Sequence, residues 1–343
     1  MRAGIFVAYW PWFTPQEQVS LAVLADEKGL DSVWVAEAWG QDAVSLLGFL
    51  AARTERIALG SGLLQIPARQ PAATAMAAVT LDVLSGGRLR LGLGVSGPQV
   101  SEGWYGVPFA RPVARTREYV EIVRAALARR GPLVHEGREY RIPLEGGTGL
   151  GKPLKLLARP VQKPVPIYLG AVGPKAVEQT GEIADGWLAF SLDPADAEVQ
   201  LAPLRRGQER SGRTQTDLDV AACVPVGLDD DLGAARDAVR PWLAFYLGAM
   251  GARDKNFDVE HAERAGHGEA ARAVQDAYLG GDRAGAAARL TDELIDAMAL
   301  ACTPAQLDDR LAAYADVGVR SLLAVPCGPD RPAIVHALAA ATA

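Results

Sequence analysis

The feature that most constrains the fold is an alternation of apolar, strand-like runs with segments of helical periodicity along the whole chain. The strand-like runs are apolar at successive positions, as parallel strands are when both of their faces are covered. Eight such runs are predicted, at 3–9, 32–35, 57–64, 89–95, 165–169, 187–190, 218–226 and 321–325. Because a helix follows each strand, this pattern predicts an α/β fold of the closed (β/α)8, or TIM, barrel type.

Helical segments separate these runs and begin or end at residues that favour helix boundaries. The first is expected over 15–29, with Pro15 in its first turn and Gly29 at its end. Further helices are expected over 43–53, 72–84, 111–130, 175–184 and 333–341. The competing fold, a doubly wound open sheet, would place a Gly-x-Gly-x-x-Gly turn after the first strand. The sequence there is Tyr9-Trp10-Pro11-Trp12, so the barrel is favoured.

Two long segments interrupt the regular alternation. At 343 residues the chain could form one enlarged barrel or two ordinary domains, and the continuous alternation favours a single domain over 1–343. Residues 131–164 are rich in glycine and proline and too long for an ordinary connection, so they are expected to be an insertion. Residues 227–317 are expected to form a mainly helical extension.

Charge and cysteine content exclude several classes of function. A formal net charge of -6 argues against a nucleic-acid partner. No stretch approaches the roughly 18 to 20 apolar residues of a membrane helix, and Pro11 interrupts the apolar amino-terminal run, which is read as a strand rather than a signal peptide. Cys223, Cys302 and Cys327 are scattered and odd in number, so no disulfide framework is expected. These observations predict a cytoplasmic protein without a membrane partner.

Candidate functional residues follow the predicted strands, because chemistry in such barrels belongs at the carboxyl ends of the strands. Glu37 and Trp39 follow the second strand, where they could contact a cofactor or form a solvated loop. Gly62, Leu63 and Gln65 follow the third, where glycine suggests a bulge or a close backbone approach to a ligand. Arg69 lies just beyond, either as an anion contact or in a surface ion pair.

The loops after the fourth and fifth strands are poor in large side chains. Val95, Ser96, Gly97 and Gln99 leave room for a flat ring and offer backbone N–H donors. In the second loop, residues 170–175, proline suits a first helical turn whose free N–H groups bind anions. We therefore expect a phosphate there, with a plain helix start as the alternative. The residues of this second loop singled out as ligands are Gly170, Ala171, Gly173, Pro174 and Lys175.

The chain lacks the usual parts of a hydrolase or a metalloenzyme. Its four histidines do not follow predicted strands and are not spaced with acids as a metal cluster, so no metal site is expected. No Gly-x-Ser-x-Gly elbow is present. Hydride transfer between bound rings needs position and electrostatics more than nucleophilic side chains, so this composition favours a cofactor-dependent enzyme with a small-molecule substrate.

Several motifs together resemble the bacterial-luciferase-like flavin and deazaflavin oxidoreductases. The turn 84–88 running into 91–94 is typical of this class, and 95–106, 173–177 and 182–187 resemble its coenzyme F420-dependent branch, which includes methylenetetrahydromethanopterin reductase. The likeness extends to 248–253 and 315–319. The resemblance implies an F420-dependent oxidoreductase that forms a homodimer through its outer helices.

The resemblance also implies roles for individual residues. Gly62-Leu63 stands where this family has a non-prolyl cis peptide in a bulge against the deazaflavin, and Glu37 stands where an acid contacts the ring edge. Residues 95–97 match the loop beside the coenzyme, and 170–174 match its phosphate loop. By the same comparison, 131–164 should cover the carboxyl-terminal mouth of the barrel as a lid. Its Lys152 and Lys155 would then meet the anionic tail of the coenzyme.

Two departures from the family bear on the reaction. The sugar-phosphate dehydrogenases of the family have a histidine and a glutamate where this chain has Ala38 and Pro98. Reduction of an activated C=C or C=N bond is therefore expected rather than alcohol oxidation, with Glu37 or solvent handling the proton. Two alternatives stay open: a two-component monooxygenase that uses flavin mononucleotide (FMN), and a non-catalytic protein that binds F420.

Overall fold

Eight parallel strands close into a barrel, as the alternating pattern predicts. The computed structural model describes residues 1–9 and 11–342, so Trp10 of the predicted first turn and Ala343 lie outside the described residues. In order around the wall, the strands are β1 (Arg2–Val7), β2 (Ser32–Val35), β3 (Ala58–Ser61), β5 (Leu89–Gly94), β8 (Ile167–Gly170), β9 (Gly186–Phe190), β10 (Asp219–Leu228) and β12 (Ser321–Pro326). The pairing of β12 with β1 closes the barrel.

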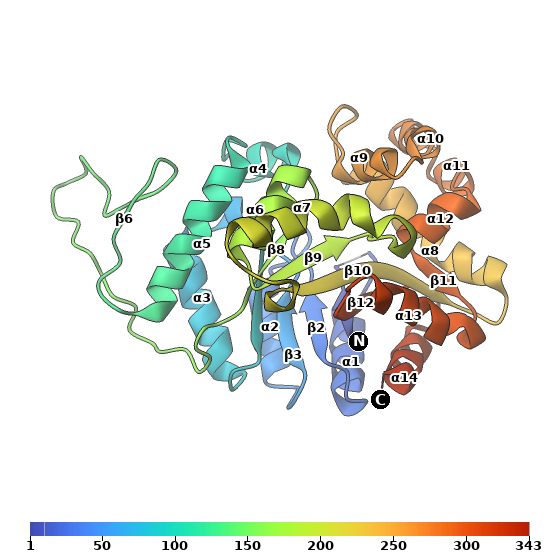
Figure 1. Cartoon of the computed structure of the whole chain (residues 1–343), viewed down its shortest axis with the longest axis horizontal. Helices are drawn as coiled ribbons and strands as arrows, with labels where there is room; N and C mark the ends of the chain where they lie inside the picture. The colour runs from blue at the N-terminus through green and yellow to red at the C-terminus, as the bar shows by residue number, and fades with distance from the viewer. Residues whose placement is uncertain (10, 343) are drawn as a thin grey trace.

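Helices surround the barrel (Figure 1). The outer helices are α1 (Pro15–Glu27), α2 (Ala43–Ala51), α3 (Pro71–Leu84), α5 (Pro112–Ala128), α6 (Pro174–Ile183), α7 (Ala197–Arg210), α13 (Leu307–Asp316) and α14 (Arg331–Ala341). Short 3-10 turns occur at Ile66–Ala68, Pro194–Asp196, Gln215–Asp217 and Pro304–Gln306. The start of α1 shows how local sequence sets a boundary: Thr14 and Glu17 form a reciprocal capping box just before and within the first turn.

Aromatic side chains fill much of the barrel interior. Trp34 of β2 packs edge-on against Tyr168 of β8, with ring centroids 4.9 Å apart. Nearer the carboxyl ends of the strands, Phe6 of β1 packs edge-on against Phe190 of β9 at 5.9 Å. Space for Trp34 exists because Gly60 carries no side chain: a Cβ there would lie 2.2 Å from the indole ring. The interior is thus a packed core below the mouth.

The segment 131–164 lies beside the barrel rather than over its mouth. Its short strands β6 (His135–Glu136) and β7 (Arg141–Ile142) form a hairpin that extends away from the barrel next to α5 (Figure 1). Glu118 of α5 accepts backbone hydrogen bonds from 138–140, and Asp82 of α3 accepts them from 161–162. The expectation that 131–164 forms a lid over the mouth is therefore wrong. The physical reason is that a connection from a helix to the next strand begins and ends at the face opposite the mouth.

The mainly helical extension occupies the mouth instead. It follows β10 and contains α8 (Leu232–Ala249), α9 (Phe257–Arg264), α10 (Gly268–Leu279), α11 (Arg283–Ala288), α12 (Asp292–Met298) and the short strand β11 (Leu300–Cys302). A segment that leaves the carboxyl end of a barrel strand starts at the mouth, so this position follows from the connectivity. Among the described residues, none of the helices is both long and apolar enough to cross a lipid bilayer.

Candidate active site

A bulge marks the carboxyl end of the third barrel strand. The short strand β4 (Leu64–Gln65) continues β3 and pairs with the same neighbour, β5. Gly60 pairs with Arg90, and Leu64 pairs with Leu93, so one extra residue is inserted on the β3–β4 side. The peptide bond between Gly62 and Leu63 within this segment is cis. The bulge and the cis peptide that the family resemblance implies are both present.

The side chain of Leu63 lies over two glycines on neighbouring strands. A Cβ on Gly94 of β5 would lie 2.5 Å from Leu63 Cδ1, and a Cβ on Gly170 of β8 would lie 2.4 Å from the same atom. Gly62 is similarly restricted, because a Cβ there would lie 2.4 Å from the ring of Phe6. These glycines are therefore required by close packing around the bulge, which brings the ends of β3, β5 and β8 together.

Glu37 joins the loop after β2 to the segment after β4. Its carboxylate, with a side chain only 3% exposed, forms a bidentate ion pair with Arg69 at 2.6 and 2.7 Å. The same two oxygens accept hydrogen bonds from the backbone N–H of Gln65 at 3.0 Å and of Ala43 at 3.3 Å. Arg69 also pairs with Asp42. Of the two alternatives for Arg69, an anion contact or an ion pair, the structure shows the ion pair, with two carboxylates of its own chain.

A second hydrogen-bonded chain connects Gln65 with the loop after β5. The Tyr105 hydroxyl donates to Gln65 Oε1 at 2.8 Å, and Gln65 Nε2 donates to Ser96 Oγ at 3.3 Å. Ser96 has a left-handed backbone with φ of 61°, beside the partly buried Val95 and Gly97. The short helix α4 (Pro98–Gly103) leads from this loop towards Tyr105. The structure therefore brings the predicted residues of the second, third and fourth strand ends into one hydrogen-bonded network.

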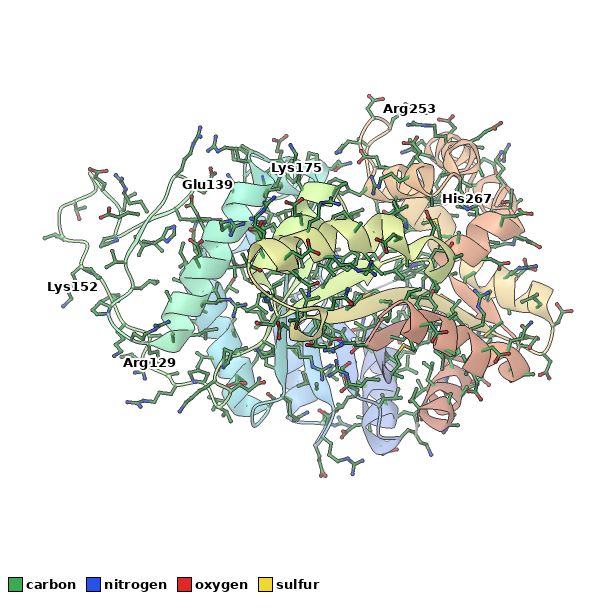
Figure 2. All side chains as sticks on the ribbon, viewed as in Figure 1. Arg129, Glu139, Lys152, Lys175, Arg253 and His267 are labelled. Atoms are coloured by element: carbon green, nitrogen blue, oxygen red, sulfur yellow. The ribbon has the colours of Figure 1, made fainter. Side chains whose placement is uncertain are left out.

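The loop after β8 ends at an uncapped helix start. Gly173 is the N-cap of α6 and makes no side-chain cap hydrogen bond, and Pro174 occupies the first turn. Ala171, two residues earlier, is held by a hydrogen bond of 2.9 Å from the Trp187 indole N–H to its carbonyl. Lys175 is exposed at the start of α6, whereas Lys152 lies at the outer end of the 131–164 segment (Figure 2). Of the lysines considered as anion contacts, Lys175 alone lies at this loop.

Helix α9 crosses the mouth between these loops. Just before its start, the carbonyl of Lys255 accepts a hydrogen bond of 3.4 Å from Gln99 Nε2 in the loop after β5. His261 Nε2 lies 2.8 Å from the carbonyl oxygen of Ser191, which follows β9. At the end of α9, Arg264 donates to the carbonyl of Val172 in the loop after β8. This helix is therefore fixed at three points around the rim.

Two cavities lie next to α9. One, of about 60 Å³, lies between α6, α7 and α9, and its lining includes Pro174, His261 and Arg264. The other, of about 20 Å³, lies between the carboxyl ends of β9, β10 and β12 and the helices α8, α9 and α12, and its lining includes Trp242 and Asp258. The first cavity includes Val172 and Pro174 of the loop after β8, whereas no described residue of the predicted loops lines the second.

Four residues that the extension contributes to the mouth were not predicted from the sequence. Trp242, Asp258, His261 and Arg264 follow no predicted strand, and their own spacing carries no motif. One signal could have found them: the extension leaves a barrel strand at its carboxyl end, so its residues are candidates for the mouth. Among the described residues, no three or more His, Cys, Asp or Glu side chains come together in a way that could hold a metal ion.

Comparisons with known proteins agree with this architecture. The model of the family described as luciferase-like monooxygenase matches residues 1–321. A Mycobacterium tuberculosis protein provisionally named a coenzyme F420-dependent oxidoreductase is 44% identical over 300 residues, or 86% of each chain. The 5,10-methylenetetrahydromethanopterin reductase of Archaeoglobus fulgidus is 31% identical, over 90% of this chain and 89% of its own.

A solved structure shows the same arrangement over nearly the whole chain. The coenzyme F420-dependent tetrahydromethanopterin reductase of Methanopyrus kandleri superposes with a TM-score of 0.82 and 26% sequence identity, covering 99% of this chain and 98% of the other. The family match and the shared barrel lead to one conclusion. The chain belongs to the luciferase-like monooxygenase family.

Proposed function

We propose that this chain is an oxidoreductase that binds coenzyme F420 at the mouth of its barrel and reduces a C=C or C=N bond of a planar organic molecule. The observation that carries the proposal is the meeting of three backbone-lined segments, 62–65, 95–99 and 170–175, at adjacent strand ends. F420 is the coenzyme in the names of the Mycobacterium tuberculosis relative and of the Methanopyrus kandleri reductase. The substrate class is inferred from the residues at the mouth.

The residues at the mouth suit a planar ring. Leu63 presents an apolar side chain beside Gly94 and Gly170, and a larger residue at either glycine would push it out of place. Gln65 and Ser96 offer polar groups within one hydrogen-bonded network at the edge of this apolar patch. A mainly apolar surface with a few fixed polar groups is typical of cofactor sites. We assign Gly62, Leu63, Gln65, Val95, Ser96, Gly97 and Gln99 to the ring.

The start of α6 suits the phosphate of the same coenzyme. No side chain caps this helix start. Pro174 has no N–H and the N–H of Ala176 donates to the Gly173 carbonyl, so the N–H of Lys175 is the first-turn donor left for an anion, which the helix dipole also favours. The cavity next to Pro174 is also lined by a cationic group, Arg264. Gly170, Ala171, Gly173, Pro174 and Lys175 are therefore assigned to the phosphate end.

Protein and coenzyme would divide the chemistry between them. When bound, the reduced deazaflavin supplies the two-electron hydride chemistry, while the protein supplies position, electrostatics and exclusion of water. Glu37 was expected to handle a proton, but both of its oxygens accept hydrogen bonds from Arg69 and from backbone N–H groups. We infer that Glu37 positions the loops around the ring, and that the proton comes from another group.

Coenzyme binding is tested by fluorescence titration of the purified chain. We expect the protein to quench F420 fluorescence with a dissociation constant in the micromolar range, and to bind FMN more weakly. Tight binding of FMN without binding of F420 would reject the proposal in favour of a two-component monooxygenase. Tight F420 binding without turnover of any electron acceptor would instead favour a non-catalytic binding protein.

The variant Gly170→Ala tests whether the ring lies against Leu63. Its new Cβ would lie 2.4 Å from Leu63 Cδ1, so the leucine side chain must leave its present position. We expect at least a tenfold weaker F420 affinity in the same titration, equivalent to about 1.4 kcal/mol. Gly147→Ala is the matched control, because a Cβ there lies 3.7 Å from Leu144 on the distant insertion. Equal affinities for the two variants would place the ring elsewhere.

A further inference from the structure

The larger cavity at the mouth adjoins the turn that is assigned to the coenzyme phosphate. Val172 and Pro174 of that loop line it, together with Val177 of α6, and α7 contributes Val199 and Pro203. Its volume of about 60 Å³ has room for roughly four to six water-sized atoms, because one water needs roughly 10–15 Å³. That space suits a short chain and not a ring. It therefore suits what a coenzyme carries beyond its phosphate.

His261 of α9 presents an unpaired acceptor to this cavity. The residue is only 7% exposed, and its Nε2 lies 2.8 Å from the carbonyl oxygen of Ser191. Because a carbonyl only accepts hydrogen bonds, Nε2 carries the proton. Burial lowers the pKa of His261, so the ring is neutral and Nδ1 is an acceptor. Among the described residues Nδ1 has no hydrogen-bond partner, yet it is not sealed in the core, so it faces the cavity that His261 lines.

Hydrogen-bond donors lie on the other walls of the cavity. Arg264 makes a long hydrogen bond of 3.5 Å to the carbonyl of Val172. The acid next to it on α9, Glu263, pairs with Arg272 instead. Gln200 of α7 adds an amide to the lining. The cavity thus combines apolar walls with an acceptor and donors from two helices, as small-molecule sites commonly do.

The charges around the cavity favour an uncharged occupant. Asp193 and Asp196 follow β9 and line the cavity together with Arg264, so two acids stand against one base. Asp193 accepts a hydrogen bond of 2.9 Å from the N–H of Ala195, and Asp196 is exposed. An anion inside would meet this excess of negative charge, whereas a neutral amide can form hydrogen bonds without that cost. The ionised phosphate is therefore better placed at the start of α6 than within the cavity.

Coenzyme F420 carries a neutral amide next to its phosphate. Its phosphodiester leads through a lactyl amide to a chain of glutamates, whereas FMN ends at the phosphate. The lactyl amide is short and uncharged, and it consists of a methyl-bearing carbon, a carbonyl and an N–H. These groups correspond to the valine and proline walls, to the donors and to Nδ1 of His261.

We propose that the cavity between α6, α7 and α9 binds the lactyl amide of F420, and that this subsite selects F420 over coenzymes that end at the phosphate. The proposal rests on the function proposed above. His261 Nδ1 accepts the amide N–H, Arg264 donates to the carbonyl, and Val199 belongs to the apolar wall beside the methyl group. Specificity for the coenzyme then comes partly from helices of the extension and not only from the loops that meet the ring.

The test compares F420 with deazariboflavin phosphate, which has the same ring and phosphate but no lactyl amide. Fluorescence titration of the full-length chain gives both dissociation constants. We expect the parent to bind F420 about tenfold more tightly, because F420 gains two hydrogen bonds and an apolar contact. Val199→Phe fills the cavity from α7. We expect it to weaken F420 binding about tenfold, to the level of deazariboflavin phosphate, whose own affinity is unchanged.

Val134→Phe is the matched control for Val199→Phe. Val134 is 54% exposed and Val199 46%, but Val134 lies on the segment beside the barrel, so its replacement is expected to change neither affinity. A second variant, His261→Phe, removes the acceptor and is expected to weaken F420 binding about fivefold while leaving deazariboflavin phosphate unaffected. Urea unfolding establishes that each variant is folded, and Val199→Phe keeps the contact between His261 and Ser191.

The two ligands separate failure of the subsite from failure of the proposed function. Equal affinity of the parent for both ligands would overturn the subsite. Val199→Phe leaving F420 affinity unchanged, or weakening both ligands equally, would also overturn it. A parent chain that binds neither deazaflavin would instead overturn the function proposed above.

Discussion

Replacing Arg88 with alanine is expected to lower the free energy of unfolding by about 4 kcal/mol while leaving F420 affinity unchanged. The guanidinium donates five hydrogen bonds of 2.7–3.1 Å, to the carbonyls of Ser85, Ile57, Ala51 and Thr54 and to the Thr54 hydroxyl. These groups belong to the turns at the face opposite the mouth. Without the guanidinium, the partly buried carbonyls lose their donor, and each unsatisfied group is costly.

Arg53→Ala is the control for this prediction, because Arg53 is exposed nearby and contacts the face of Phe49 with its guanidinium 5.6 Å from the ring centroid. We expect that change to shift the free energy of unfolding by about 0.5 kcal/mol or less. For both variants, urea unfolding gives the free energy of unfolding and fluorescence titration gives the F420 affinity. A loss of F420 affinity in a folded Arg88→Ala protein would contradict the assignment of this turn to stability alone.

Glu37→Ala is expected both to destabilise the fold, by about 3 kcal/mol, and to weaken F420 binding at least tenfold. The change leaves the N–H groups of Ala43 and Gln65 without their acceptor and removes the bidentate partner of Arg69. The segment that contains Gln65 is then no longer held to the loop after β2. Both effects are measured on the same preparation, by urea unfolding and by fluorescence titration.

The control for Glu37 is Asp42→Asn. Asp42 also pairs with Arg69, but its side chain is 46% exposed and it caps α2 through the N–H of Ser45. Asparagine keeps the capping acceptor, and exposed ion pairs contribute only about 0–1 kcal/mol, so a small effect is expected. If Glu37 were instead a free proton donor, Glu37→Gln would abolish turnover while preserving both stability and coenzyme affinity.

Much of the barrel was predictable because the apolar periodicity reflects burial directly. The predicted second strand, 32–35, coincides with β2, and the other predicted strands overlap the observed ones. The predicted third strand, 57–64, is divided in the structure at Gly62 and Leu63, where the bulge interrupts the pairing. Helix α7 was not predicted because its segment is polar and contains Pro203 and Gly207. Gly207 allows close packing on α6: a Cβ there would lie 1.8 Å from the carbonyl oxygen of Glu178.

The candidate site was predictable where residues follow strands directly, and not where tertiary packing brings them in. Glu37, Gln65 and Ser96 come together because adjacent parallel strands end at one rim. The pairing of Glu37 with Arg69 depends on side-chain direction, which periodicity does not specify. The segment 131–164 was misplaced by analogy although its connectivity puts its ends at the opposite face. Asp258 could not be predicted as a residue of the mouth, because the packing of α9 brings it there and no sequence motif marks it.

The central claim is that the mouth loops bind a phosphorylated deazaflavin ring. A crystal structure of this chain with F420 tests that claim most directly. We predict that the ring lies against Leu63 and is covered by α9, with the phosphate at the Gly173 turn. Density for the coenzyme in any other place, or a mouth closed by side chains with Gly173 turned away from it, would contradict the account.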